Sequence, residues 1–151
     1  MHGLDKIMRP RSIAVIGAST KEHTIGSDIM KRLLEYGYTG NIYPINPKDS
    51  EIHGLKAYPS VLDVADDIDM ALIVINAKYV LPVIDQCHQK GIKGVVVISA
   101  GFKETGAAGA ELEKQLAAKI QEYGMTLVGP NCLGVVNTDP AVRLDACFAE
   151  S

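Results

Sequence analysis

Short apolar runs alternate with amphipathic segments along most of the chain. Five runs rich in β-branched residues, at 12–16, 41–45, 70–75, 94–98 and 126–128, have the length and composition of β-strands. Each is almost wholly apolar, as is typical of parallel strands covered on both faces. Segments with helical periodicity lie between them, at 26–36, 80–90 and 107–123. The alternation predicts an α/β fold with a doubly wound, Rossmann-like parallel sheet in three α/β/α layers.

The helical segments carry recognisable ends. Gly37, Gly91 and Gly124 stand where a helix gives way to a loop, a position that favours a left-handed backbone. A further short helix is expected within 59–67, with Ser60 as its N-cap. The clearest apolar stripe is predicted on the last helix, and its members are Leu112, Leu116, Ala117 and Ile120.

Length and charge narrow the class of protein. The 151 residues are enough for one compact unit, 1–151, with its own core. The chain has 15 Lys and Arg residues against 18 Asp and Glu residues. It therefore lacks the excess of basic residues that is typical of nucleic-acid-binding proteins. Nothing approaches the roughly 20 apolar residues that a membrane span needs, and the first residues have no apolar signal-peptide core. We therefore expect a cytoplasmic protein that binds neither nucleic acid nor membrane.

The sulfur and imidazole side chains do not form a metal-ligand pattern. The three cysteines Cys87, Cys132 and Cys147 lack CxxC spacing and are odd in number, so we interpret them as reduced thiols. The four histidines are scattered and each is interpreted as a lone exposed side chain. The sequence therefore predicts no metal site.

Candidate chemistry gathers in the loops that follow the strands. In a doubly wound sheet, ligands bind outside the carboxyl ends of the strands, where the strand order reverses. The loop after the first strand holds Gly17, Ala18, Ser19 and Thr20, and Ile25 and Gly26 stand at the start of the next helix. Small residues let the backbone approach a phosphate, and a helix N-terminus attracts one. The expected ligand is a nucleotide whose phosphates lie over this helix start.

The same loop does not match the dinucleotide fingerprint. Its first, third and sixth positions hold Gly17, Ser19 and Glu22, so only one of the three expected glycines is present. The second strand ends in Asn46-Pro47-Lys48, where an NAD site usually carries an acidic residue for the ribose. Because lysine favours a phosphate over a neutral ribose diol, Lys48 is the one residue that supports an alternative interpretation as an NADP site. The alternatives are that Gly17 only packs strand against helix and that Lys48 is a solvated surface charge.

Four motifs together resemble one family. Ile13-Ala-Val-Ile-Gly-Ala-Ser, Tyr43-Pro-Ile-Asn-Pro-Lys, Ile98-Ser-Ala-Gly-Phe and Gly129-Pro-Asn-Cys-Leu-Gly134 are similar to the CoA-binding domain of NDP-forming acyl-CoA synthetases, relatives of the succinyl-CoA synthetase α subunit. The resemblance covers almost the whole chain and implies coenzyme A as the cofactor. It implies phosphate contacts from Ser19 and Thr20, and nucleotide contacts from Pro47 and Lys48. Asn76 and Ala77 would border the adenine or the entry of the pantetheine arm.

The remaining implied contacts lie along the pantetheine arm. Ser99, Ala100 and Gly101 would line it, and Asn131 and Cys132 would lie near the thiol end. The amides of the arm need backbone polar groups flanked by small side chains, which residues 99–101 offer. Asn131 can equally fix its own loop, and Cys132 can equally be a small buried hydrophobic residue.

The resemblance implies that this is the N-terminal piece of a larger synthetase, of the acetate-CoA ligase type, with further domains or subunits as partners. No histidine here matches the family's phosphorylated histidine, so no residue is assigned a catalytic role and the chain alone is not expected to catalyse the ligation. Alternatives are the CoA-binding regulatory region of a protein acetyltransferase and a free-standing CoA-binding protein. An NAD(P)-dependent oxidoreductase ranks last, since a paired histidine and carboxylate for hydride transfer is missing.

Overall fold

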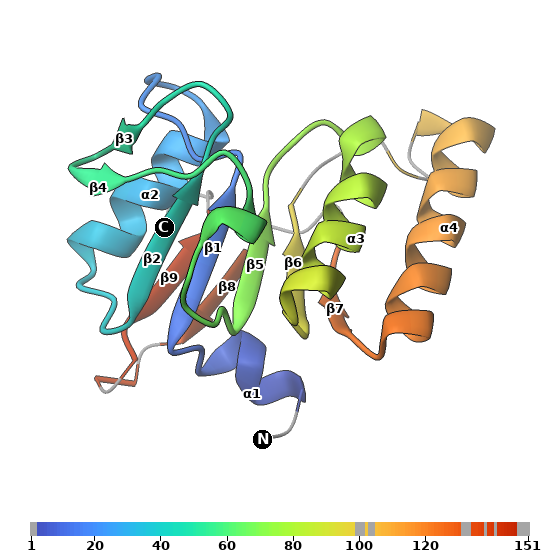
Figure 1. Ribbon diagram of the computed structural model, residues 1–151. Coiled ribbons are helices and arrows are strands. Elements are labelled where there is room, and N and C mark those ends of the chain that lie inside the picture. Colours follow the sequence, from blue (N-terminus) through green and yellow to red (C-terminus); the bar gives the residue numbers. More distant parts are fainter. Residues whose placement is uncertain are drawn as a thin grey trace.

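The fold is a five-stranded parallel sheet in the order β2-β1-β5-β6-β7 (Figure 1). The computed structural model describes residues 3–98, 102, 105–130, 134–137, 139–140 and 142–147. The strands of the sheet are β1 (Ser12–Ile16), β2 (Asn41–Ile45), β5 (Met70–Ile73), β6 (Gly94–Val97) and β7 (Thr126–Val128). Because β2 lies on one side of β1 and β5 on the other, the strand order reverses beside β1. The doubly wound, Rossmann-like prediction is confirmed, and the reversal fixes where a ligand is expected.

The three long helices that were predicted are present. They are α2 (Ile25–Glu35), α3 (Val80–Lys90) and α4 (Ala107–Tyr123). Thr24 caps α2 by accepting a hydrogen bond from the Ser27 N–H. Gly91 and Gly124 end α3 and α4 in the left-handed region, as predicted. The short helix after Pro59 is a single 3₁₀ turn, η1 (Val61–Asp63), with Ser60 as its N-cap.

The three central strands β1, β5 and β6 are buried along their whole length, which explains why their sequences are apolar apart from Ser12. Alternate residues along each strand face opposite sides of the sheet. Ala14, Ala71 and Val95 pack with α3 and α4, whereas Ile13, Met70 and Val96 pack with α1 (Gly3–Met8) and α2. On α4, Leu116 and Ile120 are buried as predicted. Ala117 is exposed instead, because the buried face passes through Gly109, Leu112 and Leu116 at helical spacing.

Several elements were not predicted. Besides α1, they are the 3₁₀ turn η2 (Ala77–Tyr79) and two antiparallel hairpins, β3 (Glu51–Ile52) with β4 (Leu55–Lys56) and β8 (Gly134–Asn137) with β9 (Leu144–Cys147). The second hairpin supplies Leu144 to the core on the α2 face, and Val142 joins it from the connecting turn. Strand β5 also ends at Ile73, two residues earlier than expected. Val74 and Ile75 stay apolar because they pack on the core after the strand ends.

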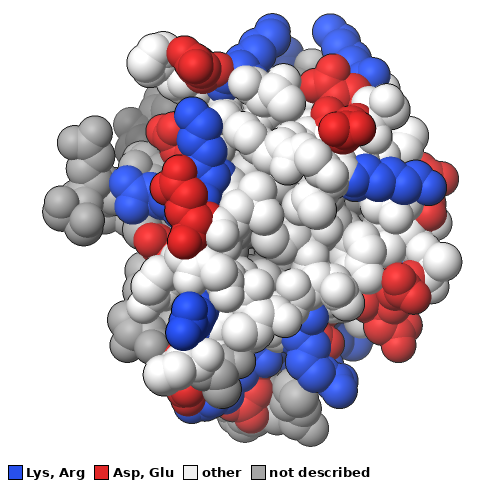
Figure 2. All heavy atoms as spheres, turned by 90° about the vertical axis from the view of Figure 1, so that its left-hand side faces the viewer, with Lys and Arg blue, Asp and Glu red and all other residues white. Residues whose placement is uncertain are grey.

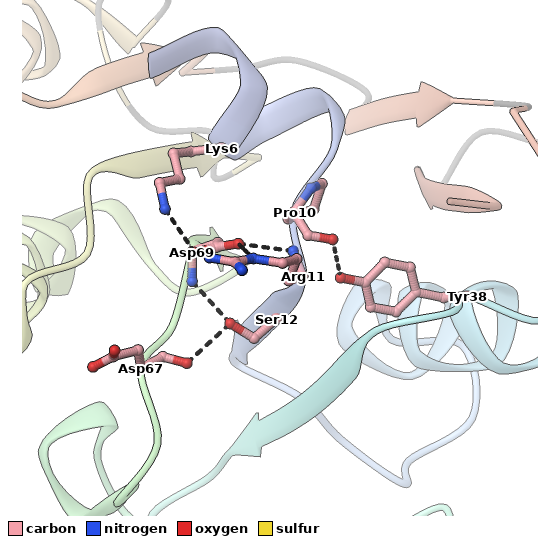
Figure 3. Close-up of polar contacts among 7 residues, drawn as sticks. All are labelled: Lys6, Pro10, Arg11, Ser12, Tyr38, Asp67 and Asp69. Carbon is pink, nitrogen blue, oxygen red and sulfur yellow. Dashed lines mark hydrogen bonds and ion pairs between the residues drawn. The ribbon is translucent and has the colours of Figure 1, made fainter. Parts of the chain in front are cut away.

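A polar network anchors the amino ends of β1 and β5, far from their carboxyl ends (Figure 3). Asp69, whose side chain is 8% exposed, accepts hydrogen bonds from Lys6 Nζ and from the Arg11 N–H, both at 2.8 Å. The Ser12 hydroxyl donates to the Asp67 carbonyl and accepts from the Asp69 N–H. Tyr38 donates to the Pro10 carbonyl at 2.6 Å. These contacts tie α1, β1 and the residue before β5 into one unit.

Charge is mixed over the face on the β2 side of the molecule. Figure 2 shows a broad uncharged area in the middle of this face, with acidic and basic side chains of both signs around it. A single-sign basic stripe, typical of nucleic-acid binding, is not seen on this face. Within the described residues, no helix combines the length and the apolar character required to cross a bilayer.

Candidate functional site

A cleft of about 460 Å³ opens at the carboxyl ends of β1 and β2, beside the reversal of strand order. Its volume falls in the range of small-molecule sites. The loop after β1, the turn after β2 and the first turns of α3 all contribute to the wall. The lining residues are Ile16, Gly17, Ala18, Ser19, Ile45, Asn46, Pro47, Pro59, Ile75, Tyr79, Val83 and Gln86.

Two glycines bring the loop after β1 against its neighbours. Gly17 has a φ of +100°, and a Cβ there would lie 2.2 Å from the Val74 carbonyl oxygen. A Cβ on Gly26 would lie 2.0 Å from the Gly17 carbonyl oxygen. Gly26 therefore makes room for the loop backbone, whereas the sequence suggested that it makes room for the ligand. The result is that the start of α2 packs directly on the loop that lines the cleft.

The loop presents small residues at the cleft. Ala18 is 1% exposed and Ser19 is half-buried, and its hydroxyl accepts a hydrogen bond from the Lys21 N–H at 3.0 Å. Thr24 caps α2 immediately after this loop. Short side chains beside a helix N-terminus are the arrangement that phosphate binding needs.

Asn46 ties this loop to the turn after β2. Its Nδ2 donates to the Ala18 carbonyl at 3.0 Å, and its Oδ1 accepts from the N–H groups of Lys48 and Asp49 at 2.8 and 3.0 Å. The Gly17 N–H also donates to the Ile45 carbonyl. One carboxamide thus fixes both walls of the cleft relative to each other.

Replacing Asn46 by aspartate tests this link with almost no change of shape. The carboxylate cannot donate to the Ala18 carbonyl and repels it, so N46D is expected to lower the free energy of unfolding by about 1–2 kcal/mol. Urea denaturation measures the loss. N41D, which makes the same change at an exposed position of β2, is the control and should stay close to wild type. Equal losses in the two variants would contradict the role given to Asn46.

The other predicted residues lie as follows. Pro47 lines the cleft, while Thr20 and Lys48 are exposed at its loops and are not part of the lining. Ile25 is the first residue of α2 and is 41% exposed. Asn76 caps η2 by accepting from the Lys78 N–H at 3.1 Å, and Ala77 is buried in the core. The remaining predicted residues lie outside the described part of the chain: Ser99, Ala100, Gly101, Asn131 and Cys132.

Seven lining residues were not among the predicted site residues. Three of them, Ile16, Ile45 and Ile75, lie at or just after strand ends, and the other four come from later segments. Pro59 precedes η1, Tyr79 ends η2, and Val83 and Gln86 lie on α3. Helical periodicity gives no signal for them, because only the packing of α3 beside η1 brings these segments to one cleft. Tyr79 stands directly before the helix predicted at 80–90, and this aromatic residue in a strand-end loop was the one available hint.

Several side chains are accounted for by local structure. Cys87 is fully buried, and burial raises the pKa of its thiol to about 12, so it stays protonated. His53, expected to be a lone exposed residue, instead contacts the Ser27 hydroxyl through Nε2 at 3.2 Å. His88 stacks on Tyr123 with ring centroids 3.9 Å apart. Across the described residues, no group of three or more His, Cys, Asp or Glu side chains is placed to hold a metal ion.

Fold and cleft together define a doubly wound domain with a loop of small residues at the reversal of strand order. The chain belongs to the CoA-binding domain family, whose model matches residues 11–138.

Two curated relatives are similar over nearly the whole chain. The α subunit of acetate-CoA ligase (ADP-forming) I from Pyrococcus furiosus is 50% identical over 149 residues, which cover 96% of this chain and 32% of that protein. The 4-hydroxybutyrate-CoA ligase (ADP-forming) of Nitrosopumilus maritimus is 46% identical, with 94% of this chain and 20% of that protein covered. The chain thus spans a third or less of the length of these ligases.

A solved structure supports the same relationship. The dinucleotide-forming acetyl-coenzyme A synthetase 1 of Ca. Korarchaeum cryptofilum, determined with phosphate and ADP, matches with a TM-score of 0.91 and 46% identity. The match covers 99% of this chain and 32% of that one. The fold is therefore that of one segment of a larger synthetase.

Proposed function

We propose that this chain is the CoA-binding module of an NDP-forming acyl-CoA synthetase. The observation that carries the proposal is the cleft at the β1–β5 reversal, lined by Gly17, Ala18 and Ser19, in a chain of the CoA-binding family. The ligand would place its diphosphate on the loop after β1, where small residues and the start of α2 favour negative charge.

Different residues of the chain would contact different parts of the ligand. Ser19 and the backbone of Gly17 and Ala18 would face the diphosphate. Asn46 holds the turn that carries Pro47 and Lys48, and the Lys48 ammonium would neutralise a phosphate of the nucleotide part. Residues 99–101 remain predicted to contact the pantetheine arm, and Asn131 and Cys132 the region near the thiol.

The reaction of the intact synthetase would join a carboxylic acid to CoA with cleavage of a nucleoside triphosphate. Similar stretches occur in relatives named for acetate and for 4-hydroxybutyrate, which supports the view that the acid is selected elsewhere in those proteins. Other domains or subunits would therefore be required as partners. A regulatory region of a protein acetyltransferase and a free-standing CoA-binding protein stay as alternatives, and the sequence of the intact gene product would separate them.

Calorimetric titration tests the binding function directly. The chain is expected to bind CoA and acetyl-CoA, and to bind NAD and NADP far more weakly, since the loop lacks two of the three dinucleotide glycines. NAD binding at least as tight as CoA binding would contradict the proposal.

Charge reversal at Lys48 tests the contact with the nucleotide. K48E is expected to weaken CoA binding by about tenfold, because an ammonium facing a phosphate is replaced by a repelling carboxylate. K31E makes the same charge change at an exposed position of α2 and is the matched control. A smaller effect of K48E on 3′-dephospho-CoA would assign Lys48 to the 3′-phosphate. Equal affinities of K48E and K31E for CoA would mean that Lys48 is a solvated surface charge with no contact to the nucleotide.

A further inference from the structure

A second pocket lies at the opposite end of the sheet from the cleft. This amino-end pocket encloses about 290 Å³ and is lined by residues 9–11 before β1, by residues 39–41 at the start of β2, and by Val142. Strands of five residues, about 16 Å long, separate it from the cleft. Its smaller volume suits a ligand of few atoms.

The lining of the amino-end pocket is basic. Arg9 and Arg11 contribute two guanidinium groups, and none of the seven described lining residues is acidic. A guanidinium presents five N–H donors in a planar fork that matches the oxygens of a carboxylate or a phosphate. Two such groups on one small pocket are therefore suited to an anion.

The Arg11 guanidinium keeps donors available for a ligand (Figure 3). Its Nε lies 3.6 Å from Asp69 Oδ2, which is too long for a hydrogen bond, and its side chain is 79% exposed. Asp69 already accepts hydrogen bonds from Lys6 Nζ and from the Arg11 N–H, both at 2.8 Å. Because Lys6 balances the charge of Asp69, Arg11 brings one positive charge in excess to the pocket.

Arg9 has one acidic partner and further donors. Its Nη2 lies 2.9 Å from Asp139 Oδ2, and its side chain is 54% exposed. A contact through one nitrogen uses only part of a group with five donors. An anion in the pocket would compete with Asp139 for Arg9, so removal of the Asp139 charge should strengthen anion binding.

Backbone contacts fix the walls of the amino-end pocket. The Arg11 carbonyl accepts a hydrogen bond from the Asn41 N–H at 3.1 Å, and the Thr39 N–H donates to the Val142 carbonyl at 3.2 Å. Gly40 permits this close approach, because a Cβ there would lie 2.5 Å from the Arg11 carbonyl oxygen. The arginines extend from a frame that is formed before a ligand arrives, which lowers the entropic cost of binding.

We propose that the amino-end pocket is a second ligand site, which binds a small oxyanion between the guanidinium groups of Arg9 and Arg11. The ligand is a carboxylate or a phosphate group, since both present the paired oxygens that a guanidinium fork recognises. Binding there adds to the stability of the folded chain, because the ligand contacts segments that only the fold brings together. The site goes beyond the CoA-binding function and does not depend on it.

NMR titration of the ¹⁵N-labelled full chain tests the site. Inorganic phosphate and acetate are the two probes, and sodium chloride at equal ionic strength is the reference. Both probes are expected to give saturable shifts of the Arg9 and Arg11 Nε–H signals. R11Q removes the charge but keeps the N–H that bonds Asp69, and it should weaken binding by about tenfold. D139N should strengthen binding by about threefold, because it releases Arg9.

A matched variant and a second signal separate the site from general charge effects. K114Q removes one positive charge at an exposed position of α4 and should bind both probes as wild type does. Phosphate that enters the cleft is reported by the Ser19 amide, whose shift should be the same in R11Q. Tighter binding of phosphate than of acetate would assign a phosphate ligand, and the reverse order a carboxylate.

Three results would overturn the anion site. They are equal shifts of the arginine signals with sodium chloride, an equal loss of affinity in K114Q and R11Q, and weaker or unchanged binding in D139N. CoA affinity, measured by calorimetry, should be equal in R11Q and wild type. A loss of CoA affinity in R11Q as large as the loss of anion affinity would show that the two sites are not separate, which would also overturn the proposal.

Discussion

Replacing Gly17 by alanine is expected to lower the free energy of unfolding by about 3 kcal/mol and to abolish CoA binding. Two causes add. The φ of +100° disfavours any side chain, and the new Cβ would lie 2.2 Å from the Val74 carbonyl oxygen and 2.8 Å from its carbon. Backbone atoms cannot rotate away as a side chain can, so the loop would have to move out of the cleft. Urea denaturation and CoA calorimetry measure the two effects.

G91A separates backbone conformation from crowding. Gly91 has a φ of +88°, but nothing lies within 4 Å of a Cβ placed there. G91A should therefore cost only the left-handed conformation, about 1 kcal/mol, and should leave CoA binding intact. If G17A and G91A lost the same free energy, the close contact between the loop and Val74 would not be a constraint on this fold.

Replacing Asp69 by asparagine is expected to lower the free energy of unfolding by about 2 kcal/mol at neutral pH. The carboxylate is nearly buried and accepts from both Lys6 and the Arg11 N–H. The amide keeps the shape but loses the charge that balances Lys6, which remains only 24% exposed. D63N removes a solvent-exposed carboxylate and should change stability little.

The effect of D69N should depend on pH. Burial by itself raises the pKa of Asp69, but the hydrogen bonds from Lys6 and the Arg11 N–H, with the positive charges of both residues, hold that pKa below its ordinary value. Such a carboxyl adds stability above its unfolded-state pKa of about 3.9 and loses it as pH falls through the folded value. The stability gap between wild type and D69N should therefore shrink below about pH 4. A gap that stays constant from pH 7 to pH 2 would show that Asp69 acts by shape alone.

The strands and long helices were predictable because their signals are local and repeated. Burial on both faces leaves β6 wholly apolar and β1 apolar apart from Ser12, and glycines mark the ends of α3 and α4. The hairpin β3–β4 has only two residues in each strand, too few for an alternating pattern to stand out. The end of β5 was misplaced because Ile75 remains apolar as part of the cleft wall rather than of the sheet.

The candidate site was predictable where one loop defines it. Gly17, Ala18, Ser19, Asn46 and Pro47 follow two strands directly, and the structure brings all five to the cleft. Tyr79 and Gln86 were missed because their position depends on how α3 lies beside η1, a relationship between segments that periodicity does not encode. Asn46 belongs to the turn that was predicted to meet the nucleotide, and its bonds to Ala18, Lys48 and Asp49 give it a structural task.

The distance between the Asp69 network and the cleft has a consequence for redesign. The anchoring contacts join β1 and β5 where these strands begin, whereas the turns that line the cleft follow the carboxyl ends of β1, β2 and β5. Substitution of Pro47, Tyr79 or Gln86 to accept another cofactor would thus leave the contacts of the Asp69 network unchanged. Affinity and robustness can be altered separately in this protein, with Gly17 and Asn46 as the positions at which the two requirements meet.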